Sequence, residues 1–291
     1  MPRHLIRVAG VGIVAAALAL TAQAAGAQAT PSRIVSLVPA LTQMLFAIGA
    51  GDRVMAVSSY DEDPPAVKKL PRVGALLDPD VERIIAMRAD LVIVYGSQTD
   101  LMTQLKRAAI PYFEYRHGGL QTITTTIRAL GQRTGHNTEA ERLAETIDRR
   151  MQALRQRTAP LAKPRTLLVF TRERGSLRNI YASGGRGFLH EMLEAAGGIN
   201  VFADVQAESV QASSEMILAR APDVILELRA EDIPPEPQQA AEVNSWRTLA
   251  SVPAVRNNRL YFLPGRWYVV PGPRVAEAAE AMAAVLHGPG K

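Results

Sequence analysis

Residues 138–157 read TEAERLAETIDRRMQALRQR and carry an unbroken helical pattern near the middle of the 291-residue chain. The apolar side chains share one helical face and are Ala140, Leu143, Ala144, Ile147, Met151 and Leu154. Thr138 and Glu141 have the spacing of a capping box, and Pro160 and Pro164 are expected to stop the helix. Because about 20 helical residues span roughly 30 Å, the width of a small domain, the pattern predicts a rigid connector between two lobes. An ordinary helix packed within one domain fits the same pattern.

The sequence on both sides of this helix alternates short apolar runs with longer amphipathic runs, which indicates an α/β architecture. We expect strands at Arg33–Leu37, Val54–Val57, Leu91–Val94, Tyr112–Phe113, Thr166–Phe170, Val224–Leu228 and Leu260–Phe262. We expect helices at Ala40–Ile48, Val81–Arg88, Thr99–Ala108, Ile123–Thr134, Phe188–Ala195, Ser214–Arg220 and Pro273–Leu286. Several of the expected strands are continuous runs of Val, Ile and Leu, which are typical of buried parallel sheets.

Two copies of a helix–turn–strand unit flank the central helix. Residues 82–93 read ERIIAMRADLVI and residues 215–226 read EMILARAPDVIL, with Glu, Ile, Ala and Asp at the same four places. A glycine-rich helix exit precedes each copy, GAGDRV at residues 49–54 and GGINV at residues 197–201. Four shared residues alone can arise by chance, but two matched pairs in the same order favour a pair of pseudo-symmetric lobes.

The N-terminus has the features of a secretory signal peptide. Arg3 and Arg7 precede an uncharged, largely apolar stretch that closes on Ala27-Gln28-Ala29, and its core is shorter than the roughly 20 residues of a membrane span. We therefore expect an exported mature chain that begins near Thr30. The sequence has no cysteine, so the expected periplasmic protein carries no lipid anchor on cysteine and no disulfide.

The remaining composition argues against several classes of function. The formal charge of +5 falls to +3 without the two arginines of the leader, and the basic residues are dispersed, so we expect no nucleic-acid partner. The sequence contains no Gly-x-Ser-x-Gly, Walker A or His-Glu-x-x-His motif, and its five histidines lack the spacing of metal ligands. We therefore expect no enzyme, no catalytic residue, no protein-bound metal and no cofactor; a metal would arrive already chelated.

The ordered set of motifs resembles the helical-backbone class (class III) of periplasmic binding proteins, which serve ABC importers of vitamin B12, ferric siderophores and haem. The resemblance covers essentially the whole mature chain and is closest to the B12-binding branch. The matching segments are Arg33–Thr42, Val57–Tyr60, Pro64–Pro65, Val81–Ile84, Asp90–Ile93, Ala195–Gly198, Ser214–Glu215, Trp267–Tyr268 and Pro273–Arg274.

The resemblance implies two Rossmann-like lobes with parallel sheets, joined by one long rigid helix, with the ligand in a cleft between the lobes. The expected domains are the signal peptide (1–29), the N-terminal lobe (30–136), the connecting helix (137–160) and the C-terminal lobe (161–291). The expected partner is a homodimeric inner-membrane ABC permease with its ATPase, served by a monomeric carrier. In this family one glutamate per lobe pairs with permease arginines, and Glu82 and Glu215 match those positions. The helix dipole also favours a glutamate in a first turn, but the recurrence of the pair favours docking.

A cleft for a bulky metal chelate needs aromatic faces and a few polar groups. Candidates lie at or beyond the expected strand ends: the aromatic residues Tyr60, Tyr95, Trp267 and Tyr268, and the arginines Arg172, Arg174 and Arg266. A packing role for the aromatic residues and a solvated surface position for the arginines are the alternatives.

The sequence departs from the B12-binding branch at several of these positions. Leu76 and Ser209 align with tryptophans of that branch, Tyr95 stands in for another, and Arg266 replaces an acid. We predict a corrinoid ligand, with a ferric siderophore or haem as the alternative; for haem, Tyr60, Tyr95 and His117 are candidate axial ligands. An enzyme on a chelatase-like scaffold and a non-transport receptor are the competing classes, and the first of them needs a metal cluster, cysteines or an acid–base histidine.

Overall fold

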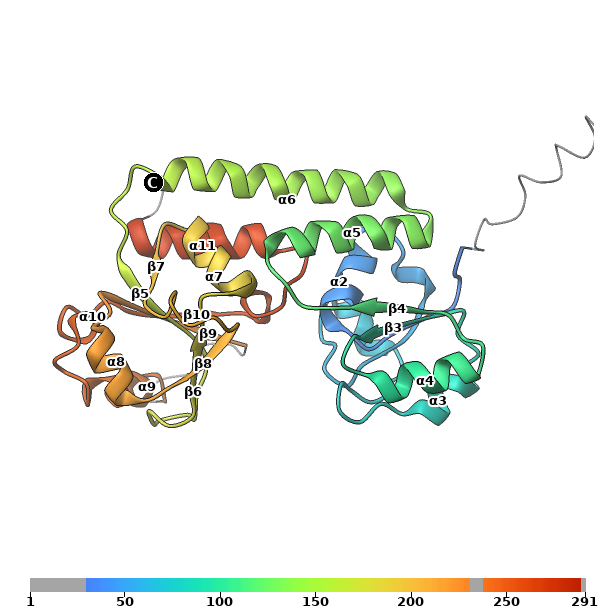
Figure 1. Ribbon diagram of the computed structural model, residues 1–291, viewed down its shortest axis with the longest axis horizontal. Helices are drawn as coiled ribbons and strands as arrows, with labels where there is room; N and C mark the ends of the chain where they lie inside the picture. Colours follow the sequence, from blue (N-terminus) through green and yellow to red (C-terminus); the bar gives the residue numbers. More distant parts are fainter. Residues whose placement is uncertain (1–29, 231–237, 289–291) are drawn as a thin grey trace, which may run out of the picture. The chain divides into compact units, whose positions relative to one another are not determined.

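Two β-sheets, one before and one after the long helix, organise the computed structural model, which describes residues 30–230 and 238–288 (Figure 1). The expected signal peptide lies outside the described residues. From Pro31 onward the chain forms a single compact unit. We refer to the first sheet and its helices as the N-terminal lobe, and to the second sheet and its helices as the C-terminal lobe. In the part of the chain that is described, no helix is both long and apolar enough to cross a bilayer.

The N-terminal lobe contains a four-stranded parallel sheet in the order β2-β1-β3-β4. Its strands are β1 (Ile34–Ser36), β2 (Val54–Val57), β3 (Leu91–Tyr95) and β4 (Tyr112–Tyr115), as the sequence predicts. Its helices are α2 (Pro39–Ala47), α3 (Val81–Ala86), α4 (Thr99–Arg107) and α5 (Leu120–Thr134), with short 3-10 turns at Gly51–Arg53 and Pro65–Lys69. Helices α2 and α5 cover one face of the sheet, and α3 and α4 cover the other (Figure 1).

The C-terminal lobe contains a six-stranded mixed sheet in the order β10-β9-β5-β6-β8, with β7 paired to β5. Its strands are β5 (Arg165–Thr171), β6 (Ile180–Ser183), β7 (Ile199–Asn200), β8 (Ser209–Ala212), β9 (Val224–Arg229) and β10 (Leu260–Pro264). Its helices are α7 (Gly187–Ala195), α8 (Ser214–Arg220), α9 (Gln238–Arg247), α10 (Pro253–Arg256) and α11 (Val275–His287), with a 3-10 turn η3 at Arg266–Tyr268.

The expectation of parallel pairing holds for β10, β9, β5 and β7, whereas β6 and β8 are antiparallel. β6, β7 and β8 were not among the strands expected from the sequence. Residues in β8 alternate between exposed and buried, and β6 exposes Tyr181, so neither strand has the continuous apolar run of a fully buried parallel strand. The two strands therefore extend the sheet as a half-exposed antiparallel edge.

The long helix α6 (Asn137–Thr158) packs against α5 of the N-terminal lobe and against α7 and α11 of the C-terminal lobe (Figure 1). It ends two residues before Pro160, as the sequence predicts. The predicted capping box is wrong: Thr138 lies inside the helix, and the Glu141 carboxylate accepts hydrogen bonds from Arg128 of α5 at 3.0 Å. The Glu141 carboxylate therefore pairs with the guanidinium of Arg128 instead of capping the N-terminus of its own helix. The domain boundaries around α6 remain a prediction.

One hydrophobic cluster continues beneath α6 from lobe to lobe. Leu130 of α5, Leu154 of α6 and Met282 of α11 are fully buried in it. Two polar contacts reinforce this region: Arg150 of α6 pairs with Glu280 of α11, and the Leu120 backbone N–H at the start of α5 donates to Glu191 of α7 at 2.7 Å. The lobes therefore share a core as well as a connecting helix.

The repeated unit recognised in the sequence is one structural element present twice, as α3–β3 and α8–β9. Asp80 caps α3 by accepting from the N–H of the third helical residue, and Ser213 caps α8 in the same way. Each helix leaves through a residue in the left-handed region at the same place of the unit, Arg88 at φ 50° and Ala221 at φ 44°. Each copy then anchors the start of the adjacent strand, because the carboxylates at positions 90 and 223 accept from the N–H groups of residues 33 and 165.

Candidate functional site

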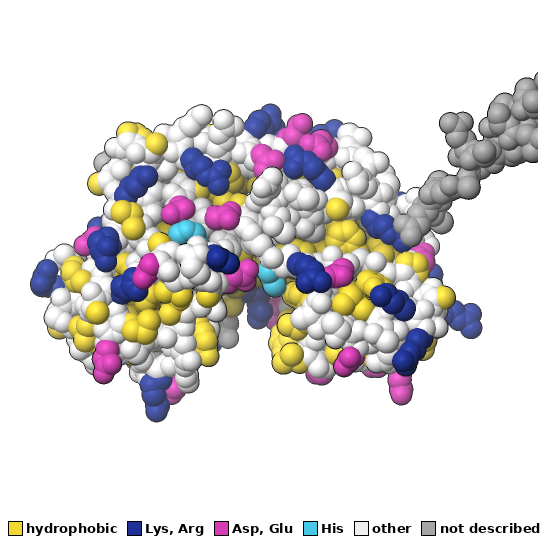
Figure 2. All heavy atoms as spheres, viewed as in Figure 1, with side chains coloured by type: hydrophobic (Ala, Val, Ile, Leu, Met, Phe, Trp, Pro, Cys, Tyr) yellow, Lys and Arg dark blue, Asp and Glu magenta, His cyan; other side chains and the backbone are white. Residues whose placement is uncertain are grey.

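A cavity of about 390 Å³ lies between the two lobes. Its lining residues come from α2, from the loop after β2, from the ends of β9 and β10 and from the segment that precedes α11; they are Gln43, Glu62, Asp63, Ala230, Arg266, Trp267 and Arg274. The loops after β2, β9 and β10 all follow carboxyl ends of parallel strands, which is where open α/β sheets place their ligands. Figure 2 shows the surface hollowed between the lobes, with acidic and basic side chains interspersed rather than gathered by sign.

Trp267 forms the aromatic wall of this cavity. Its ring stacks on Tyr268 with centroids 4.1 Å apart, and the Arg274 guanidinium lies 4.5 Å from the indole centroid. Gly265 makes the turn that presents it: φ is 128°, and a Cβ there would lie 2.1 Å from the indole nitrogen. Trp267 and Arg266 therefore line the interlobe cavity, whereas Tyr268 is only 4% exposed and packs behind the indole. A ligand-binding role for these three residues stays a prediction.

Charges of both signs border the cavity. Arg266 Nε lies 3.0 Å from Glu62 Oε2, which joins the C-terminal lobe to the N-terminal lobe across the cavity. Arg274 holds Glu277 through two hydrogen bonds of 2.9 and 2.8 Å, and this contact raises the pKa of Arg274. Glu62, Asp63 and Arg274 were not among the site residues expected from the sequence. The first two follow Tyr60 beyond the end of β2, so the rule that selected Tyr60 would have found them.

Tyr60 projects from the loop that follows β2 and is 68% exposed. The loop is held by Asp61, whose carboxylate accepts from the Ser58 backbone N–H at 3.0 Å and from the Ser58 hydroxyl. Arg72 donates to the backbone carbonyls of Ser58 and Asp61. Burial raises the pKa of Asp61, while the bonds from Ser58 oppose that effect. A buried polar anchor thus fixes the loop that carries an exposed ring.

Tyr95 belongs to an aromatic cluster at the carboxyl ends of β3 and β4 and does not line the interlobe cavity. Its ring centroid is 6.1 Å from that of Tyr115 and 5.6 Å from that of His117. Burial and then the negative charge of Asp61 raise the pKa of Tyr95 to about 12, so its phenol stays protonated at neutral pH. Burial lowers the pKa of His117, and Glu208 of the C-terminal lobe partly opposes this shift.

Arg172 is buried in a network of four charged side chains at the ends of β5 and β9. Its guanidinium lies 2.9 Å from Glu227 and 2.5 Å from Glu242, and Arg229 contacts both carboxylates at 2.6 and 2.8 Å. The indole N–H of Trp246 donates to Glu227 at 2.9 Å. Arg172 and Arg174 line a separate cavity of about 140 Å³. Arg172 is therefore committed to ion pairs within the C-terminal lobe.

The expected docking glutamates are exposed on equivalent helices. Glu82 is the second residue of α3 and Glu215 the second residue of α8. In Figure 1 these two helices lie on the faces of their sheets away from α6. The structure thus places one exposed carboxylate on each lobe, at the same position of the repeated unit.

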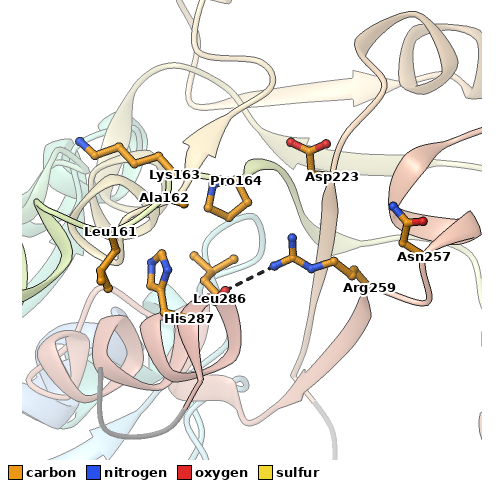
Figure 3. Close-up of a pocket in the computed structure, with 9 residues that line it drawn as sticks. All are labelled: Leu161, Ala162, Lys163, Pro164, Asp223, Asn257, Arg259, Leu286 and His287. Carbon is orange, nitrogen blue, oxygen red and sulfur yellow. Dashed lines mark hydrogen bonds between the residues drawn. The ribbon is translucent and has the colours of Figure 1, made fainter.

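A third cavity, of about 530 Å³, lies at the opposite ends of the strands in the C-terminal lobe (Figure 3). Asp223 and Arg259 directly precede β9 and β10, and Arg259 donates to the Leu286 carbonyl at 3.3 Å. This third cavity is remote from the aromatic candidate residues, which lie at the carboxyl ends of the strands. Among the described residues, no group of three or more His, Cys, Asp or Glu side chains is placed to hold a metal ion.

Comparisons with known proteins agree with this architecture. A family model described as periplasmic binding protein matches residues 34–267. A vitamin B12-binding protein of Yersinia pseudotuberculosis is 29% identical over 277 residues, which cover 94% of this chain and 91% of the relative. The haem-binding protein RhuT of Roseiflexus superposes with a TM-score of 0.75 at 27% identity, covering 88% of this chain and 98% of its own. The vitamin B12-binding protein BtuF of Vibrio cholerae gives 0.74 at 26% identity, covering 88% and 96%.

Proposed function

Because this chain belongs to the periplasmic binding protein family, we propose that it is the solute-binding component of an ABC importer and carries a corrinoid ligand. The observation that supports this most is the cavity between the lobes, walled by Trp267 and flanked by Glu62, Arg266 and Arg274. Its volume of about 390 Å³ lies within the range of roughly 300–1,000 Å³ of small-molecule sites. Relatives that cover most of this chain are named for vitamin B12 binding, which favours a corrinoid.

Haem is the alternative ligand that a specific observation favours. Arg266 and Arg274 border the cavity and pair there with Glu62 and Glu277, and a haem propionate would replace these carboxylates as the partner of a guanidinium group. Tyr60 is an exposed phenol, and the Tyr95–His117 pair lies at the ends of neighbouring strands in the N-terminal lobe. A ferric siderophore would use the same arginines for its negative charge. All three ligands bring their own metal, so the proposal needs no resident cofactor and no metal ligated by the protein alone.

We further propose that the carrier acts in the periplasm after its signal peptide has been cleaved off. It acts there as a monomer and has no catalytic activity. It delivers its ligand to a homodimeric permease that is driven by an ATPase. Glu82 and Glu215 support this delivery because each presents an exposed carboxylate at the same place of its lobe. Charged contacts across an interface mainly set orientation and the rate of encounter. Two equivalent carboxylates suit a partner with two equivalent basic sites.

Titrating the purified mature protein with cyanocobalamin, haemin or a ferric hydroxamate tests the ligand assignment. Each probe has its own visible absorption spectrum, so a saturable spectral change identifies the ligand directly. We expect saturation with cyanocobalamin at a stoichiometry of one. Saturation with haemin alone, accompanied by a shift of its Soret band, would assign the alternative ligand. A protein that binds none of the three probes would contradict transport of a metal chelate.

A further inference from the structure

Each copy of the repeated unit exposes an aliphatic side chain beside its proposed docking glutamate. Ile85 on α3 is 37% exposed and Leu218 on α8 is 41% exposed. They occupy the same place of the two copies, three residues after Glu82 and Glu215. Residues three apart lie side by side on one helical face. A carboxylate and an apolar side chain therefore share the exposed face of both helices.

The main anchor of each helix on its sheet is a different side chain from the exposed aliphatic one. The preceding residue, Ile84 in one copy and Ile217 in the other, is fully buried and anchors each helix to its sheet. The following residue is an exposed alanine in both copies, at positions 86 and 219. Because alanine has the smallest side chain with a Cβ, a partner can approach the helix closely there. Large aliphatic residues that are more than a third exposed thus recur at equivalent positions of the two lobes.

We propose that these residues form two equivalent docking patches, each of which inserts its aliphatic side chain into an apolar socket bordered by a cation. The first patch is Glu82, Ile85 and Ala86, and the second patch is Glu215, Leu218 and Ala219. The sockets belong to the two subunits of one homodimeric membrane partner, so this inference rests on the proposed docking of the carrier on its permease. A chain that presents the same three-residue patch once on each lobe fits a partner that offers the same socket twice.

The charge of the patches favours this partner over a second copy of the chain. Two copies associating through these patches would bring Glu82 or Glu215 against another carboxylate, and like charges in contact are unfavourable. The nearby basic side chains are already engaged: Arg83 donates to the Arg72 carbonyl, and Arg220 pairs with Asp204. The patches therefore present apolar surface beside carboxylates that form no ion pair within the described part of the chain, which is complementary to a basic, partly apolar socket.

The two components of each patch contribute differently to binding. Burial of apolar surface is insensitive to ionic strength in the range that screens charges, whereas exposed ion pairs weaken as salt is added. Ile85 and Leu218 should therefore supply affinity that persists at high salt. Glu82 and Glu215 should supply orientation and an attraction that salt removes.

The test measures docking of the purified, full mature protein on the purified permease–ATPase complex in lipid nanodiscs by surface plasmon resonance, at about 50 and 500 mM salt. Replacing Ile85 and Leu218 together by serine should weaken docking about 10-fold or more at both salt concentrations. Replacing Glu82 and Glu215 together by glutamine should weaken docking at low salt and have little effect at high salt. Ile199→Ser is the matched control, because Ile199 is 42% exposed outside both patches and should not affect docking.

The possible outcomes separate this inference from the docking proposal on which it rests. If the serine variant docks like the parent while the glutamine variant is impaired, the glutamates dock but the apolar sockets are rejected. If both variants dock like the parent, the docking role of these helices fails altogether. If the parent self-associates in sedimentation and the serine variant does not, the occupant is a second copy and the inference is overturned. Thermal melts of all variants exclude misfolding, and an Ile85→Ala, Leu218→Ala variant repeats the test with a stronger helix former.

Discussion

Replacing Trp267 by alanine should weaken ligand binding by about 1–3 kcal/mol, which is about 5- to 150-fold in Kd. Trp267 is the aromatic wall of the interlobe cavity, and among the described residues that line this cavity it alone is aromatic. A flat metal chelate that stacks on the indole loses its main apolar contact when the ring is removed. The affinity loss should therefore be large for a single side chain at the edge of the fold.

The same substitution should reduce stability only modestly. It removes a stack on Tyr268 with centroids 4.1 Å apart, and aromatic pairs of this kind contribute about 0.5–1.5 kcal/mol. It also removes a cation–π contact with Arg274 at 4.5 Å, and such contacts contribute about 0.5–1 kcal/mol at exposed sites. The expected loss of about 1–2.5 kcal/mol corresponds to a fall in Tm of roughly 2–10 °C. Trp267 lies over the core rather than within it.

Trp246, the other tryptophan of the chain, provides a matched control. It is fully buried, and its indole N–H donates to Glu227 at 2.9 Å. Trp246→Ala should cost about 3–5 kcal/mol of stability because it leaves a cavity and removes a bond to a buried carboxylate. The fraction of this variant that remains folded should bind ligand with normal affinity.

Thermal melts measure the change in stability, and titration followed by the visible absorption of cyanocobalamin or haemin measures the affinity of the parent and of Trp267→Ala. In a Trp246→Phe background that keeps Trp267 as the only tryptophan, quenching of its fluorescence reports whether the ligand lies against the cavity wall. Normal affinity of Trp267→Ala for the probe that the parent binds, combined with early unfolding, would refute the reasoning. Trp267 would then be a packing residue and the ligand would lie elsewhere.

Two further predictions concern the C-terminal lobe and the relation of the lobes. Burial alone would raise the pKa of Glu242, but a hydrogen bond from Arg229 and the positive charge of Arg172 outweigh it and lower that pKa below its ordinary value of 4.5. Because the folded-state pKa is lowered, the stabilisation by the ionised carboxylate is complete above about pH 4.5 and is lost as the pH falls through the folded-state pKa. Glu242→Gln should therefore have a free energy of unfolding about 3–5 kcal/mol lower than that of the parent at pH 7. Urea unfolding should show that this difference between variant and parent becomes smaller below about pH 4. If the difference in unfolding free energy between Glu242→Gln and the parent does not change with pH, the ionised carboxylate is not the cause of the stabilisation. The lobes should close only slightly when ligand binds, because they share a hydrophobic cluster and the Glu191 carboxylate of α7 accepts a hydrogen bond from the Leu120 N–H at the start of α5. Small-angle scattering with and without ligand measures the closure, and a rotation of the lobes by tens of degrees would contradict this prediction.

The main features of the fold follow from sequence patterns because each pattern has a local physical cause. The strands β1, β2, β3, β5 and β9 were predicted because runs of Val, Ile and Leu are buried on both faces of a sheet. The helix α6 was predicted because its apolar residues recur on one face over about four turns, from Ala140 to Leu154. The antiparallel β6 and β8 were missed because neither has a continuous apolar run, and three of their eight residues are exposed.

The site was less predictable because it depends on contacts between residues distant in sequence. Arg172 and Arg266 were both chosen as candidates because each follows a strand, but their environments differ in the structure. Arg172 is buried against Glu227 and Glu242, whereas Arg266 faces the interlobe cavity. No local signal distinguishes these environments, because both glutamates lie more than 50 residues from Arg172 along the chain. The pairing of Arg266 with Glu62 was unpredictable for the same reason, since it joins two loops of different lobes.

Uptake by living cells tests the central proposal most directly. A strain that lacks this chain should lose accumulation of the chelate that the purified protein binds, and a plasmid copy of the parent should restore it. The Trp267→Ala copy should restore uptake only at higher external ligand concentration. The Glu82→Lys, Glu215→Lys copy should fail to restore it although the purified variant folds and binds ligand normally, because reversed charges oppose docking. Accumulation at the parental rate in the strain that lacks this chain, or full restoration by the double lysine variant, would contradict the account.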